Sequence, residues 1–173
     1  YTYCHDHGSW FLWDGSIWRR DTKRAAFEAA REWCREFANR LPGAQRALGR
    51  LNTISAIENL MRSDSRVAVT SEVWDADPLL LGTPAGTVDL KTGALRVSAS
   101  ENMITKATAV APDHTDDCPL WRKFLDETTQ GDAEFQRYLR AISGYAATGE
   151  TTEHALFFVF GPGGNGKSVF VST

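Results

Sequence analysis

Long hydrophobic runs are missing from this chain of 173 residues. No stretch of 18 consecutive apolar residues is present, so no membrane-spanning helix is expected, and no signal-peptide pattern opens the sequence. We therefore expect a soluble, intracellular protein. The first residue is Tyr1 rather than Met. Both ends are accordingly expected to have been cut from something longer.

Cysteine is also scarce: Cys4, Cys34 and Cys118 are odd in number and far apart. This argues against a disulfide framework and fits a reducing compartment. The run from Cys4 to His7 contains two histidines and an aspartate, which suggests a metal site. No second ligand pair follows at a useful spacing, so we favour an ordinary surface segment over a zinc site.

The net charge is −3, which as a whole makes no case for nucleic acid. Its distribution is uneven. Residues 1–66 hold 11 Lys and Arg against 8 Asp and Glu, whereas residues 67–173 hold 8 against 14. The excess of basic residues in the first third would suit binding to the phosphate backbone of a nucleic acid. Charged side chains on solvated helix faces explain the excess equally well, and we favour that explanation.

The most informative segment lies near the end of the chain. Its residues fit the phosphate-loop pattern G-x-x-x-x-G-K-[ST]; they are Gly161, Pro162, Gly163, Gly164, Asn165, Gly166, Lys167 and Ser168. The apolar run 155–160 before them predicts a fully buried strand. A glycine-rich turn after a core strand is the alternative, but it leaves Lys167 and Ser168 unexplained.

Each residue type in this loop has a physical role in binding ATP. Glycines let several backbone N–H groups approach phosphate oxygens, and Asn165 tolerates the left-handed region. Lys167 supplies positive charge to the β- and γ-phosphates, and Ser168 offers a hydroxyl to Mg²⁺. A helix starting near Gly166 turns its positive end toward the anion.

Upstream, Asp14-Gly15 separates two aromatic-rich runs and predicts a β-hairpin with a two-residue turn over 9–19. The clustered tryptophans are able to stack on bases, but we favour their packing against a neighbouring helix. A helix is expected from Asp21 or Thr22 to about residue 39. A second helix is expected over about 53–61.

In the middle of the chain the sequence pattern changes from helical to β-rich. A short extended piece at 67–69 is followed by a small β-rich element over 73–110, with a tight turn at 91–93 and a further strand at 104–108. Helices return afterwards. Pro119 in a first turn marks the start of one, and the next begins at Asp132 and ends at Gly149.

The order of these features resembles a known family. Residues 83–93 are similar to its N/T-x-x-G-x-V-D-L-x-T-G motif, and the segments 104–106, 118–121, 144–151 and 157–168 follow in the expected order. The chain thus resembles the phage- and plasmid-type primase–helicases, which are related to the poxvirus primase-helicases. In these proteins a linker domain precedes a superfamily three helicase core.

The resemblance implies an α+β fold: a mainly helical domain with small β-hairpins over 1–150, then the first strand and phosphate loop of a truncated, AAA+-like α/β NTPase domain over 151–173. It implies a DNA-dependent ATPase that unwinds duplex DNA at a replication fork, with single-stranded or forked DNA as its partner and a homo-hexamer as its form in the full-length protein. The implied location is the cytoplasm of a bacterial or phage-infected cell, without a membrane partner.

The same resemblance assigns the catalytic lysine to Lys167, the metal hydroxyl to Ser168 and nothing else. The downstream acidic pair, sensor residue and arginine finger are absent from these residues, so we expect no appreciable ATP hydrolysis by this chain alone. Two alternatives stay open: a DNA-binding or oligomerisation module in residues 1–150, and an unrelated P-loop ATPase of the packaging or partition type.

Overall fold

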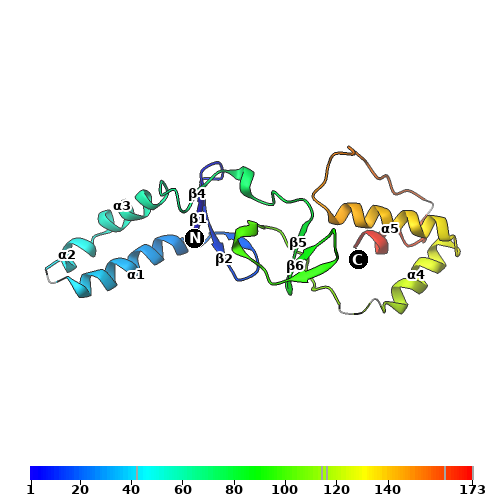
Figure 1. Cartoon of the computed structure of the whole chain (residues 1–173), viewed down its shortest axis with the longest axis horizontal. Helices are drawn as coiled ribbons and strands as arrows, with labels where there is room; N and C mark the ends of the chain where they lie inside the picture. The colour runs from blue at the N-terminus through cyan, green and yellow to red at the C-terminus, as the bar shows by residue number, and fades with distance from the viewer. Residues whose placement is uncertain (42, 114, 116, 162, 173) are drawn as a thin grey trace.

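The computed structural model describes every residue except 42, 114, 116, 162 and 173. Within that part the fold is mixed α+β, with helices at both ends of an elongated molecule and the strands between them (Figure 1). The strands are β1 (Thr2–Cys4), β2 (Ser9–Trp13), β3 (Trp18–Arg20), β4 (Ala68–Val69), β5 (Leu80–Thr83), β6 (Gly86–Asp89) and β7 (Ala94–Arg96). The helices are α1 (Ala25–Arg40), α2 (Gln45–Leu48), α3 (Leu51–Met61), α4 (Pro119–Thr129), α5 (Ala133–Ala147) and α6 (Lys167–Ser172).

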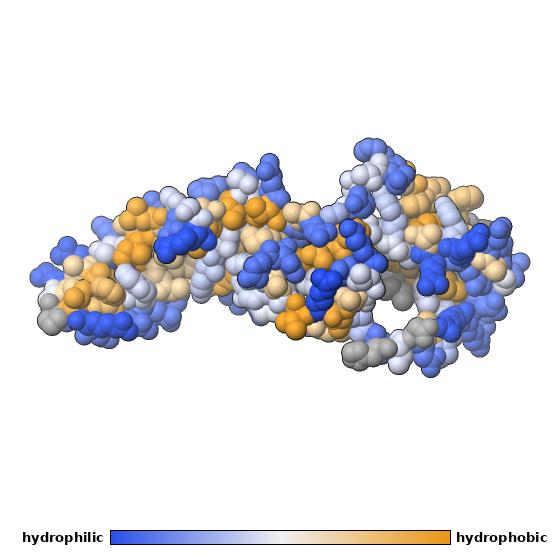
Figure 2. Space-filling model, viewed as in Figure 1, coloured by the Kyte–Doolittle hydropathy of each residue, from blue (hydrophilic) through white to orange (hydrophobic). Residues whose placement is uncertain are grey.

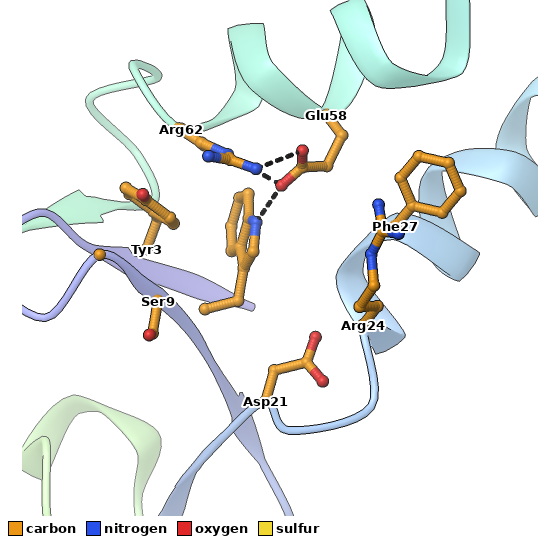
Figure 3. Close-up of a pocket in the computed structure, with 9 residues that line it drawn as sticks. Tyr3, Ser9, Asp21, Arg24, Phe27, Glu58 and Arg62 are labelled. Atoms are coloured by element: carbon orange, nitrogen blue, oxygen red, sulfur yellow. Dashed lines mark hydrogen bonds and ion pairs between the residues drawn. The ribbon is translucent and has the colours of Figure 1, made fainter. Parts of the chain in front are cut away.

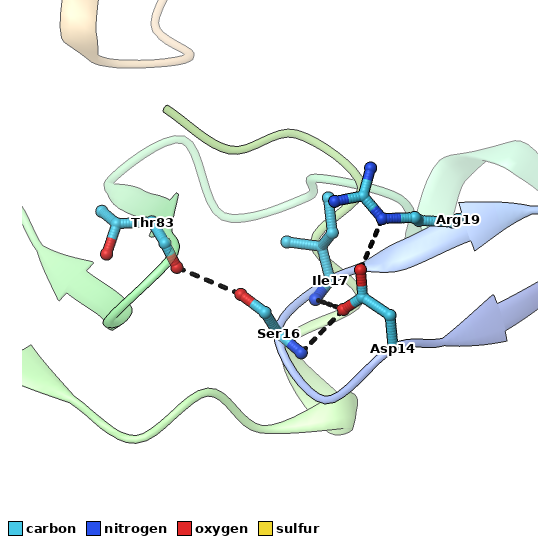
Figure 4. Close-up of polar contacts among 5 residues, drawn as sticks. All are labelled: Asp14, Ser16, Ile17, Arg19 and Thr83. Atoms are coloured by element: carbon cyan, nitrogen blue, oxygen red, sulfur yellow. Dashed lines mark hydrogen bonds and ion pairs between the residues drawn. The ribbon is translucent and has the colours of Figure 1, made fainter. Parts of the chain in front are cut away.

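The predicted hairpin is present as β2 and β3, within a four-stranded sheet of order β3-β2-β1-β4. Its turn is longer than predicted, because Trp13 pairs with Trp18 and leaves four residues between them. The Asp14 carboxylate accepts hydrogen bonds from the N–H groups of Ser16 and Ile17 (Figure 4). This aspartate turn requires more chain than a two-residue loop supplies.

Strand β1 was not predicted, and it corrects our view of the Cys4 segment. Cys4 is fully buried and packs against Phe11 and Trp18, so it is a core residue rather than part of a surface segment. His5 instead pairs a ring nitrogen with the Arg62 carbonyl at 2.9 Å. Among the described residues, no group of three or more His, Cys, Asp or Glu side chains is arranged to hold a metal ion.

Helices α1 and α3 pack side by side through small residues (Figure 1). Every fourth residue of α1 is buried, and the set is Ala26, Ala30, Cys34 and Ala38. Helix α1 begins at Ala25, later than predicted, because the Asp21 carboxylate accepts from the N–H groups of Lys23 and Ala26 across a non-helical turn. The short helix α2 between them was not predicted.

The second sheet, β5-β6-β7, is built by the motif of residues 83–93. Thr83 is buried and donates its hydroxyl to the Gly86 carbonyl at 2.8 Å. Asp89 accepts from the N–H groups of Lys91 and Thr92, which fixes the turn predicted at 91–93. The motif that carried the resemblance therefore has a structural role here.

The strand predicted at 104–108 is wrong. This segment makes only one isolated bridge, between Gly82 and Ala107, although Ile104 is buried. The Ile104 carbonyl accepts from the Trp18 N–H, and the Thr105 N–H and hydroxyl bond Asp75. The segment crosses between the two sheets and ties them together instead of extending one of them.

Other contacts join the sheets and correct the packing predicted for the tryptophans. Ser16 donates its hydroxyl to the Thr83 carbonyl, from one hairpin to the other (Figure 4). Trp10 does pack against helix α1 at Ala26. Trp18, in contrast, packs against Trp74, which lies in the segment between β4 and β5, with ring centroids 5.9 Å apart. Only part of the aromatic cluster therefore faces a helix.

Helices α4 and α5 begin where the sequence predicted. Pro119 occupies the first turn of α4, and Asp132 caps α5 by accepting from the Phe135 N–H at 2.9 Å. Helix α5 ends with Thr148 as its C-cap, one residue before the predicted Gly149. The Gly149 N–H then bonds the Pro78 carbonyl at 2.8 Å, which anchors this end of the helix to the chain preceding β5.

The buried strand predicted at 155–160 is wrong for this structure. None of these residues lies in a strand, and Leu156, Phe158 and Phe160 are 79–90% exposed. A strand forms only with hydrogen-bonding neighbours, and none of the described strands pairs with this run. The α+β first part is thus present, whereas an α/β sheet around the loop is not.

Candidate functional site

The glycine-rich loop adopts the backbone conformations that its sequence indicates. Gly161, Gly163, Gly164 and Gly166 all have positive φ angles, between 64° and 156°. Residues other than glycine rarely adopt these φ angles without strain. Asn165 is not among the residues with positive φ, so its predicted tolerance of that region is not used. Pro162 lies outside the described residues.

Lys167 bends back across the loop. Its ammonium donates to the Gly161 carbonyl at 3.1 Å and to the Asn165 side-chain oxygen at 2.5 Å. Both acceptors are neutral, so they orient the ammonium without cancelling its charge. Helix α6 begins at Lys167, close to the predicted start.

Lys167 and Ser168 line one open hollow of about 780 Å³ together with the loop glycines. Its opposite wall comes from helix α4, through Phe124 and Thr128. Gly166 lies tightly against this wall: a Cβ placed there would be 2.6 Å from the Thr128 methyl and 2.9 Å from the Phe124 ring. Gly166 is therefore required for the close approach of loop and helix, as well as for its φ angle.

The sequence analysis did not identify Phe124 and Thr128. Helical periodicity placed Phe124 on the apolar face of a helix, which says nothing about which partner covers that face. The loop and α4 are brought together by stacking of Trp121 on Phe170 of α6, with centroids 5.9 Å apart. No spacing in the sequence encodes this contact.

This arrangement has the parts of an anion site. Backbone at positive φ exposes N–H groups, and the cation Lys167 lines the same hollow. The Ser168 hydroxyl lines the same hollow, and one protein oxygen is a common contribution to Mg²⁺ bound mainly by phosphates. The residues present are chemically compatible with a magnesium–phosphate group, for which Lys167 would supply the counter-charge and Ser168 a ligand to the metal.

A second, smaller cavity of about 140 Å³ lies where the first sheet meets the α1–α3 pair (Figure 3). Glu58 is 6% exposed at its wall and accepts from the Trp10 indole N–H and from the Arg62 guanidinium. The guanidinium carbon of Arg62 also lies 5.2 Å from the centroid of the Tyr3 ring. This network joins two parts of the chain that are distant in sequence, the strands β1 and β2 and the end of helix α3.

The charges of this cavity are balanced. Burial alone would raise the pKa of Glu58, but the hydrogen bonds from Arg62 and Trp10 outweigh it and hold the pKa below its ordinary value. Glu58 is therefore ionised at neutral pH and permanently paired. A carboxylate in this state is a poor proton acceptor, so the cavity is better explained as a structural contact than as an acid–base site. Glu58 and its partners Trp10 and Arg62 are called the Glu58 joint below.

Comparison with known proteins identifies the domain to which this joint belongs. A family model described as D5 N terminal like matches residues 1–130, three quarters of the chain. The chain belongs to the D5 N terminal like family. This family is the N-terminal domain of D5-like primase–helicase proteins, and membership supports a role connected with DNA replication.

The D5 N terminal like domain includes both sheets, helices α1 to α4, and the Glu58 joint. The glycine-rich loop lies outside the matched residues, but Phe124 and Thr128, which contact it, lie within them. The family match therefore reaches one wall of the hollow. The opposite wall is formed by residues beyond residue 130.

A curated relative matches a shorter stretch of the chain. The "Uncharacterized mitochondrial protein ymf21" of Marchantia polymorpha is 33% identical over 53 residues, which are 31% of this chain and 29% of that protein. The chain thus spans less than a third of the length of this relative.

None of the helices in the described residues is long and apolar enough to cross a membrane.

Proposed function

We propose that this chain is part of a replicative DNA helicase of the phage or plasmid type, and that residues 161–168 bind ATP to drive unwinding in the full-length protein. The observation that carries the proposal is the presence of a complete phosphate-loop sequence at 161–168, downstream of a D5 N terminal like domain matched over 1–130 and separated from it by helix α5. A phosphate loop by itself indicates only an NTPase. The preceding domain directs the proposal toward DNA replication.

In this proposal each loop residue binds the part of the nucleotide or metal that its chemistry suits. The backbone of the four glycines surrounds the phosphates, with Pro162 and Asn165 completing the loop. Lys167 contacts the β- and γ-phosphates, and Ser168 would hold Mg²⁺, which supplies charge neutralisation when bound. The partners are single-stranded or forked DNA and further copies of the chain in a homo-hexamer.

The test is ATP turnover by the full-length protein with and without single-stranded DNA, compared with its Lys167→Ala variant. Turnover that DNA stimulates and the substitution abolishes is expected. Lys167 is partly exposed and donates hydrogen bonds to Gly161 and Asn165 of its own loop, so the variant should fold normally. Turnover that ignores DNA would instead favour an unrelated P-loop ATPase, such as a packaging or partition enzyme.

A second function, a binding module in residues 1–150, has one observation in its favour. Trp33 and Phe37 of α1 stack with centroids 4.8 Å apart while remaining 50% and 39% exposed. Exposed aromatic pairs are frequent in contact surfaces between proteins. This function predicts self-association or DNA binding without nucleotide, and sedimentation of the chain with and without DNA would distinguish it from a purely ATP-dependent role.

A further inference from the structure

The ring of Phe124 is held at the wall of the phosphate-loop hollow by its neighbours. Trp121 stacks on it from one turn before, with centroids 5.2 Å apart and an interplanar angle of 25°. Trp121 stacks in turn on Phe170, at 16°. Three nearly parallel rings therefore connect helix α4 to the helix that follows the loop.

This stack gives Phe124 a fixed orientation beside the loop. Its ring atoms lie 2.9 and 3.0 Å from the position of a Cβ at Gly166, and the ring lines the hollow together with Val169. The other described lining residues belong to the glycine-rich loop and its following helix, apart from Thr128. The hydroxyl of Thr128 already bonds the Phe124 carbonyl at 2.8 Å. Phe124 thus supplies the aromatic surface of this hollow.

We infer that Phe124 is a nucleobase-contacting residue: the base of a nucleoside triphosphate whose phosphates lie on the loop packs against this ring. This inference rests on the proposed function, since it needs phosphates at Lys167. The hollow of about 780 Å³ is within the usual size range of small-molecule sites and exceeds what a triphosphate alone requires. An aromatic ring is the group best suited to the apolar face of a base.

The inference also gives the kind of selectivity to expect. Every base has a π-face, so stacking tolerates different bases. No hydrogen-bonding side chain of α4 other than Thr128 lines the hollow in the described residues. Contact through Phe124 therefore increases affinity for nucleotides over bare polyphosphate, and does so to a similar extent for ATP and GTP.

The experiment compares ATP, GTP and inorganic tripolyphosphate, each with Mg²⁺, as ligands of the 173-residue chain by isothermal titration. Phe124→Leu keeps apolar volume against Gly166 and Trp121 but removes the ring, and it is expected to weaken ATP and GTP binding roughly tenfold. Tripolyphosphate has no base, so its affinity should not change. Leu120→Ala, at an exposed position of the same helix, is the matched control.

Two results would overturn the inference while leaving the proposed function intact. In one, Phe124→Leu weakens tripolyphosphate as much as ATP, which would mean that the ring only positions the loop. In the other, it changes neither, while Lys167→Ala abolishes binding of both. If the unaltered chain binds none of the three ligands, the proposed nucleotide site fails and the inference fails with it. Circular dichroism of each variant shows that the fold is retained.

Discussion

The indole N–H of Trp10 donates to the carboxylate of Glu58, 48 residues further along the chain. This bond joins β2 of the first sheet to helix α3, and the same carboxylate binds Arg62 one turn later. The D5 N terminal like domain therefore has a buried charged joint at the point where its helical end meets its β-rich centre. Figure 2 shows hydrophilic and hydrophobic residues intermixed along the visible face of the molecule. The joint has measurable consequences for stability.

Removing the carboxylate should destabilise the domain. Glu58→Ala leaves the Trp10 N–H and the half-exposed Arg62 guanidinium without their partner, and we expect the free energy of unfolding to fall by about 2 kcal/mol. Urea denaturation followed by fluorescence measures this. Glu127→Ala removes a carboxylate from an exposed pair on α4, with a distance of 3.8 Å to Lys123, and should change stability by less than about 0.5 kcal/mol. Equal effects of the two substitutions would contradict a special role of the joint.

The depressed pKa of Glu58 predicts acid lability with a definite sign. The folded protein binds this proton more weakly than the unfolded chain, whose glutamate pKa is near 4.5, so protonation favours unfolding. The stabilisation is complete above that value and is lost as the pH falls through and below it. Glu58→Gln removes this titration, so the stability difference between the two proteins should shrink between pH 7 and pH 3.5.

Other carboxylates contribute to the acid lability of the unaltered protein, since hydrogen bonds also lower the pKa values of Asp14 and Asp64, the latter to about 2. The relevant quantity is therefore the difference between the urea midpoints of the glutamine variant and the unaltered chain at each pH. A difference that stays constant with pH would show that Glu58 does not titrate in this range.

Two glycines should respond to alanine with opposite signs. Gly86 has φ +147°, and a Cβ there would lie 2.2 Å from the Arg96 carbonyl oxygen of the paired strand. Gly86→Ala must push β7 away and is expected to cost about 2 kcal/mol. Gly144 lies in helix α5 with nothing within 4 Å of its added Cβ, so Gly144→Ala should stabilise by about 0.5–1 kcal/mol. Thermal unfolding of both variants gives the two signs in one experiment.

The 173-residue chain is expected to bind nucleotide without turning it over. Its loop supplies Lys167 and Ser168, but an acidic pair, a sensor residue and an arginine finger are not encoded in these residues, and charge stabilisation in the transition state depends on them. Phosphate release assayed with high chain concentration checks this. Release above background that disappears in Lys167→Ala would show that the missing groups are dispensable.

Local signals in the sequence were reliable where one residue controls its own neighbourhood. Pro119 and Asp132 marked the starts of α4 and α5, and the run 91–93 marked the turn of the second sheet. The positive φ angles of the loop glycines are ones that this residue type adopts without a steric penalty. These features depend on contacts within a few residues, so the sequence order already contains them.

The predictions from sequence were wrong where the conformation of a residue depends on partners distant in the chain. The run 155–160 has the composition of a buried strand, yet without a paired neighbour it is exposed. Ile104 is as apolar as a strand residue, but its segment bonds across two sheets instead of joining one. Cys4 was expected in an ordinary surface segment and is instead a core residue, because β1 forms between β2 and β4.

The sequence by itself determined which chemistry to propose: the order of the glycines, Lys167 and Ser168 fits the phosphate-loop pattern, and the motif of residues 83–93 pointed to the family that the match over residues 1–130 shows. The tertiary structure alone decided which side chains meet. It placed Phe124 beside Gly166 and Glu58 beside Trp10, because packing of helices and sheets joins residues whose separation along the chain carries no periodic signal.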